Sequence, residues 1–197
     1  MKGSTRTGAA VEGCQRTDPL IPMETKRITI LGVGNLLFRD EGVGIRVVER
    51  LLRRFSFPEN VSVVDGGVLG LRLLNVIAET DHLIVVDAVR DHGAPGTLYR
   101  LEGDEVPKRL YAKNSLHQVD LLETLCVCPA LDHEPETVIL GVEPEDIETV
   151  SIELTPAVEA SVDPLIQAVL EELERLGVTL EPKGEPGDVS CDSCENY

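Results

Sequence analysis

The chain has 197 residues, enough for one domain with a substantial hydrophobic core. Its apolar fraction of 42% and mean hydropathy of +0.01 are typical of a globular protein, and no apolar run approaches the ~20 residues that cross a bilayer, so membrane insertion is not expected. A formal net charge of −17 argues against nucleic-acid binding, because that affinity comes largely from Lys and Arg on phosphates.

The two ends of the chain lack the periodic apolar positions of helices and strands. Residues 1–25 are predicted to be a flexible extension, and part of it could precede a true start at Met23. Residues 178–197 form a Pro-, Gly- and acid-rich segment that predicts a disordered acidic tail. Residues 26–177 therefore define the single predicted domain.

Five cysteines, an odd number, favour a reducing compartment over a disulfide scaffold. Residues 1–25 also lack the apolar core of a secretory signal, so a cytoplasmic location is expected. The pairs Cys126/Cys128 and Cys191/Cys194 have no second pair at a metal-finger spacing, and we interpret them as incidental.

Strand-like and helix-like segments alternate along the domain. This pattern predicts an α/β fold with three layers, in which a twisted, mainly parallel sheet of about five strands lies between helices. The predicted strands are 27–33, 61–65, 83–89 and 137–142, with 96–101 as an antiparallel edge strand.

Helices are predicted between these strands. The most regular is 43–55, whose apolar residues form one stripe, and a second covers 69–79. Ser115 is the predicted N-cap of a third helix, because Gln118 completes a capping box. Near the end, Thr155-Pro156 predicts a helix start, Pro164 a restart or kink, and Gly177 the helix end.

Four acidic residues lie at the ends of predicted strands or in the loop beyond one. They are Asp40 and Glu41 after the first strand, Asp65 after the second and Asp87 after the third. Parallel neighbouring strands end at one sheet edge, where open α/β proteins hold their active sites, so these acids are expected to converge. Three of them also have a simpler interpretation: Asp65 as a turn residue before glycines, and Asp40 and Glu41 as acids that complement a helix dipole.

His117 lies in the first turn of the helix predicted to start at Ser115. The positive end of a helix disfavours imidazolium, so a neutral His117 could ligate a metal, although it could also be a residue with no ligand. An imidazole with two carboxylates suits a borderline divalent metal such as nickel or zinc.

Two further features allow more than one interpretation. Gly32 and Gly34 resemble part of a dinucleotide-binding loop, but Leu37 occupies the position of its third glycine, which makes the signal weak. One predicted helix carries four arginines, which could be a solvated face or a surface that steers an acidic protein partner; they are Arg46, Arg50, Arg53 and Arg54.

Five segments in this order resemble the maturation endopeptidases of nickel–iron hydrogenases. They are LGVGNLLFRDEGVGIRVVERL, VVDGGVLG, VVDAV, NSLHQVDLLETL and VILGVEPE, and the resemblance covers about residues 28–176.

The resemblance implies an enzyme that removes a C-terminal peptide from the hydrogenase large-subunit precursor after nickel insertion. By motif, Glu41, Asp65 and His117 are implied as the catalytic, metal-contacting residues, with Asp40 and Asp87 as candidates behind them. The nickel is implied to belong to the substrate, while zinc or cadmium could occupy the site in purified protein. The alternatives are a non-catalytic nickel-sensing module that binds the large subunit and a nucleotide-dependent enzyme.

Overall fold

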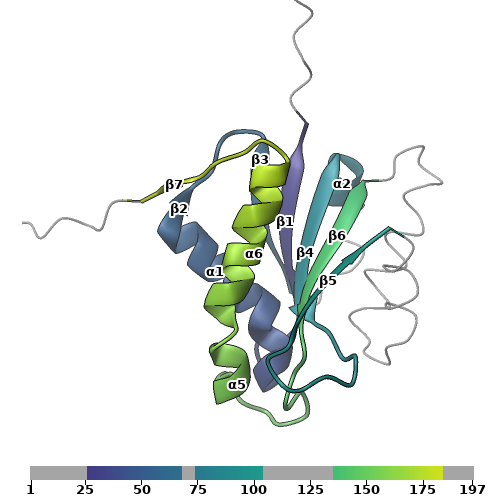
Figure 1. The fold of residues 1–197 in the computed structure, drawn as a ribbon, viewed down its shortest axis with the longest axis vertical. Helices are drawn as coiled ribbons and strands as arrows, with labels where there is room; N and C mark the ends of the chain where they lie inside the picture. The colour runs from purple at the N-terminus through teal and green to yellow at the C-terminus, as the bar shows by residue number, and fades with distance from the viewer. Residues whose placement is uncertain (1–25, 68–73, 104–134, 184–197) are drawn as a thin grey trace, which may run out of the picture.

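The computed structural model describes residues 26–67, 74–103 and 135–183, and it confirms the predicted α/β architecture (Figure 1). A five-stranded sheet has the order β3-β1-β4-β6-β5. Its strands are β1 (Ile28–Val33), β3 (Val61–Gly67), β4 (His82–Ala88), β5 (Leu98–Glu102) and β6 (Glu136–Val142).

The sheet is parallel except at one edge. β1 pairs in parallel with β3 and β4, and β4 pairs in parallel with β6. β5 pairs with β6 in antiparallel orientation, which confirms the predicted edge strand. Every residue of β4 is buried, as expected for a central strand covered on both faces. The carboxyl ends of the four parallel strands therefore lie at one edge of the sheet.

Helices cover the sheet from both sides. α1 (Val43–Arg54) and α6 (Val162–Arg175) pack on one face, where the core contains Ile30, Leu51 and Leu165. α2 (Leu74–Ala78) lies on the other face, where Ile77 packs with Leu31 and Leu83. Figure 1 shows α1 and α6 in front of the sheet with α2 at its far side. No helix in the described part of the chain is long and apolar enough to span a membrane.

Arginines of α1 bind acids and a carbonyl from the C-terminal part of the chain. Arg54 forms an ion pair of 2.6 Å with Asp163 at the start of α6, and Arg50 pairs with Glu159 of α5 (Pro156–Glu159). Arg46 donates to the carbonyl oxygen of Ile152 over 2.9 Å. These contacts join α1 to the segment 152–163. The arginines that make them are therefore neither a purely solvated face nor a surface left free for a partner.

The helix end and the tail boundary both differ from the sequence prediction. Phe55 is extended and, instead of ending α1, starts β2 (Phe55–Ser56), which pairs with β7 (Glu181–Pro182). The backbone N–H of Lys183 donates to the carbonyl of Arg54 over 2.7 Å. The predicted boundary at residue 177 is thus wrong for residues 178–183. The sequence did not predict β7, because a two-residue strand is too short to show a pattern of alternating apolar residues.

Other predictions fall partly or wholly outside the described residues. The described helix α2 confirms the second half of the predicted helix 69–79. The extension 1–25, the helix starting at Ser115, and all five cysteines lie outside the described part of the chain.

A pair of truncations tests the corrected boundary. Deleting residues 184–197 is expected to leave the free energy of unfolding unchanged, since this segment lacks periodic apolar positions. Deleting 178–197 is expected to lower it by about 2 kcal/mol, because Val178 and Leu180 pack against the core and the β2–β7 pairing is lost. Urea denaturation measures both. Equal stability of the two truncated chains would show that residues 178–183 contribute nothing.

Candidate active site

The loop after β1 brings the carboxyl end of β3 close to the turn that carries Glu41. This turn is the short 3-10 helix η1 (Arg39–Gly42). The N–H of Gly34 donates to the carbonyl of Gly67 at the end of β3 over 3.2 Å, and the N–H of Asn35 donates to the carbonyl of Glu41 over 3.2 Å. Two neighbouring residues therefore connect the β3 end with η1.

Gly34 permits this approach because it has no side chain. Its φ of +136° disfavours L side chains, and a Cβ atom there would lie 1.8 Å from the carbonyl oxygen of Glu41. A Cβ at Gly32 would lie 2.4 Å from the carbonyl oxygen of Gly44. The glycines thus serve close backbone packing. This packing explains their spacing without a nucleotide.

Asp65 lies near the end of β3, with an exposed side chain and Gly32 of β1 beside it in the sheet register. Its Oδ1 accepts the N–H of Gly67 over 2.9 Å, and Gly67 has a φ of +45°. Asp65 thus makes the local turn hydrogen bond of the simpler interpretation, although the residue itself lies within β3. The turn hydrogen bond involves Oδ1, and a carboxylate has two oxygens, so this role is compatible with ligating a metal.

Glu41 is half-buried in η1, and its N–H donates to the carbonyl of Phe38 over 3.0 Å. Glu41 thus follows β1, and Asp65 lies near the end of the neighbouring strand β3. His117 lies outside the described residues, and within residues 26–67, 74–103 and 135–183 no three His, Cys, Asp or Glu side chains form a group that could hold a metal. The complete ligand set stays a prediction.

Asp40 has a different role from its neighbour Glu41. Its side chain is completely buried and accepts four hydrogen bonds from the loop that follows β6. The donors are the N–H groups of Glu145, Asp146 and Thr155, at 2.9, 2.9 and 2.7 Å, and the hydroxyl of Thr155, at 2.9 Å. Asp40 is thus an anchor that fixes this loop against η1, rather than merely a first-turn acid.

Thr155 takes part in this anchor instead of capping a helix with its hydroxyl. It is the N-cap residue of α5, and Pro156 starts the helix as predicted. Its side chain makes no capping hydrogen bond; the hydroxyl binds Asp40.

Asp146 organises the same loop. The pKa of its carboxyl is held well below the usual value, first by the hydrogen bond with the Thr149 side chain and then by the N–H groups of Thr149 and Glu148. Arg39 of η1 adds an ion pair of 3.3 Å. The loop after β6 is therefore held to η1 by one carboxyl group in each segment, Asp146 in the loop and Asp40 in η1.

Glu143, directly after β6, is a second buried acid that holds other segments by hydrogen bonds. Its buried carboxylate accepts the N–H groups of Asp91 and Gly93, at 2.7 and 3.2 Å, and the Tyr99 hydroxyl at 2.8 Å. Burial, and then this hydrogen bond to Glu143, raises the pKa of Tyr99, so the phenol stays a donor. Asp87, at the end of β4, is also buried, and its Oδ1 accepts the N–H of Ala88 over 2.8 Å.

Sequence reasoning missed Glu143 as an anchor, although VILGVEPE was among the segments that carried the resemblance. Its position directly after a buried strand was the available signal, the same one that identified Asp65 and Asp87.

Known proteins that are similar to this chain share its fold and belong to one class of enzyme. The family model described as hydrogenase maturation protease matches residues 45–172. The Hydrogenase 2 maturation protease of Escherichia coli K12 is 42% identical over 159 residues, which are 80% of this chain and 96% of that protein. The HupD hydrogenase expression/formation protein of Bradyrhizobium diazoefficiens is 40% identical, covering 83% of this chain and 86% of its own length.

Solved structures agree. The hydrogenase maturating endopeptidase HybD from Escherichia coli superposes with a TM-score of 0.76 at 42% identity, covering 80% of this chain and 98% of that one. The [NiFe] hydrogenase maturation protease HybD from Thermococcus kodakarensis gives 0.63 at 27% identity, covering 75% and 98%. At these identities over most of the chain, the relatives and the shared fold define a peptidase. The chain belongs to the hydrogenase maturation protease family.

Proposed function

We propose that this endopeptidase recognises nickel already bound by its substrate, through Glu41, Asp65 and His117. As a family member, the chain processes the C-terminus of a hydrogenase large subunit. The observation that best supports the proposed metal contact is the connection around Gly34, which joins the η1 turn bearing Glu41 to the β3 end bearing Asp65. Two carboxylates and one imidazole suit nickel, and also zinc or cadmium in purified protein.

The proposed reaction is a hydrolysis by water. A water oxygen attacks the scissile carbonyl carbon, the carboxylate of Glu41 or Asp65 accepts the proton of this water, and the C–N bond breaks as the leaving amine takes a proton. Nickel in the substrate, or a side chain, polarises the carbonyl. Asp40 acts indirectly, since its four hydrogen bonds fix the backbone next to Glu41.

The proposed partner is the nickel-loaded large-subunit precursor, and no nucleic acid is involved. The strongly acidic composition supports the second point. The cytoplasmic location expected from cysteine usage stays a prediction. The family assignment favours the enzyme over the non-catalytic nickel-sensing module, since the relatives named above include proteases and endopeptidases.

Nickel dependence tests the proposed recognition. Incubated with the purified protein, the nickel-loaded precursor is expected to lose its C-terminal peptide, seen as one mass shift, while the nickel-free precursor stays intact. Adding nickel to the nickel-free precursor should restore cleavage. Equal cleavage of both forms would contradict nickel recognition but not protease activity, whereas cleavage of neither form would contradict the activity itself.

A further inference from the structure

Three large hydrophobic side chains are exposed together beside the candidate site. Leu37, Val150 and Ile152 have exposed fractions of 58, 74 and 63%. The described residues expose two others, Leu52 on α1 and Leu98 at the start of β5, and these lie on separate elements. We call Leu37, Val150 and Ile152 the apolar patch.

Backbone pairing brings the segments that carry the patch residues next to each other. Phe38 and Ser151 form a parallel bridge, in which the N–H of Ser151 donates to Leu37 and the N–H of Arg39 donates to Ser151, each over 2.9 Å. This pairing brings Leu37 next to the segment that carries Val150 and Ile152, and all three side chains are exposed there.

The patch is formed before any partner binds. The buried Asp40 carboxylate holds the loop after β6 by four hydrogen bonds, and the N–H of Asp40 donates to the carbonyl of Asp146 over 3.2 Å. Arg46 also donates to the carbonyl of Ile152. Little ordering entropy is thus left to lose when a partner covers these side chains, which favours binding.

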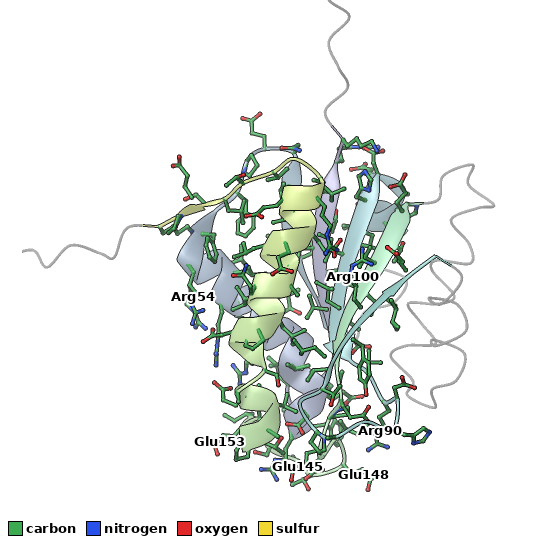
Figure 2. All side chains as sticks on the ribbon, viewed as in Figure 1. Arg54, Arg90, Arg100, Glu145, Glu148 and Glu153 are labelled. Atoms are coloured by element: carbon green, nitrogen blue, oxygen red, sulfur yellow. The ribbon has the colours of Figure 1, made fainter. Side chains whose placement is uncertain are left out.

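The patch belongs to the same structural unit as Glu41. Leu37 precedes η1 in the loop that Asn35 closes onto Glu41, and Val150 and Ile152 lie in the loop anchored to η1. A polypeptide that covers the patch is therefore brought next to Glu41. Glu148 and Glu153 are exposed on the second loop, and Figure 2 shows both at the end of the molecule where the parallel strands end.

We propose that the apolar patch docks the substrate, by binding a segment of the large-subunit precursor that carries apolar side chains next to Lys or Arg. The apolar groups of this segment would cover the patch, and its basic groups would face Glu148 and Glu153. This rests on the proposed function. Docking separates substrate choice from chemistry, because the patch residues touch no reacting atoms.

The triple variant Leu37→Ser/Val150→Ser/Ile152→Ser tests this docking. Its KM for nickel-loaded precursor is expected to rise about tenfold while kcat stays unchanged, because only the binding of remote substrate groups is lost. The double variant Leu52→Ser/Leu98→Ser is the matched control, since it removes exposed apolar groups elsewhere, and should keep the wild-type KM. Glu148→Gln/Glu153→Gln should raise KM about threefold at low salt and less at high salt.

The outcomes separate this inference from the proposed function. If the wild type does not cleave the precursor, the function fails. If the wild type cleaves and the triple variant has the same KM, the docking inference is overturned. It is overturned equally if the triple variant changes only the oligomeric state or the free energy of unfolding, since a second copy or another segment of this chain would then be the occupant.

Discussion

Glu41→Gln is expected to lower kcat for the nickel-loaded precursor by about a thousandfold. The amide keeps the size of the side chain but loses the charge that contacts nickel or accepts a proton. Metal and proton-transfer contributions of several kcal/mol correspond to this factor. The measurement is peptide release under single-turnover conditions, followed by mass.

Glu174→Gln provides the matched control for this prediction. Glu174 is an exposed glutamate near the end of α6, and its replacement makes the same chemical change far from the strand ends. It should cleave at the wild-type rate. A Glu41→Gln enzyme that also kept the wild-type rate would show that Glu41 neither contacts the metal nor takes part in the proton transfer.

Asp40→Ala is expected to lower the free energy of unfolding by about 3 kcal/mol or more. The substitution leaves three backbone N–H groups and the Thr155 hydroxyl without their acceptor in a buried place. Each buried donor without a partner costs about 1–3 kcal/mol. Urea denaturation, with the chain otherwise intact, measures the change.

The comparison variant is Asp163→Ala, which removes an aspartate that also contacts another segment. Asp163 pairs with Arg54 at the surface with 65% of its side chain exposed, so its loss should cost less than about 1 kcal/mol. Equal losses for the two variants would mean that the buried anchor contributes no more than an exposed ion pair. If the anchor also positions Glu41, the milder variant Asp40→Asn should lower kcat by more than the decrease in the folded fraction accounts for.

The sequence was sufficient for the layers and strand directions, because buried parallel strands are short β-branched runs and α1 has a clear apolar stripe. It could not supply contacts between distant segments. The end of α1 depends on Phe55 pairing with Pro182, and the arginines of α1 find acids in α5 and α6. Contacts of this kind between distant segments produce no repeating pattern in the local sequence.

For the site, the position at or beyond a strand end made Glu41 and Asp65 candidates, but it could not tell which acids are exposed and which are buried. Asp40 and Glu41 are adjacent and look equivalent in the sequence. In the structure, Asp40 is completely buried and accepts four hydrogen bonds, whereas Glu41 is half-buried. This difference is decided by the loop after β6, whose N–H groups surround Asp40. Local sequence cannot predict which acid a distant loop covers.

The most direct measurement of the central claim is nickel-edge X-ray absorption of the loaded precursor, alone and mixed with the wild-type protein, frozen within the first turnover. Contact with Glu41, Asp65 and His117 predicts additional oxygen and nitrogen neighbours of nickel in the mixture. The Glu41→Gln protein should give fewer of them. A nickel spectrum that is the same with and without protein, under conditions where the peptide is subsequently released, would contradict metal recognition by these residues.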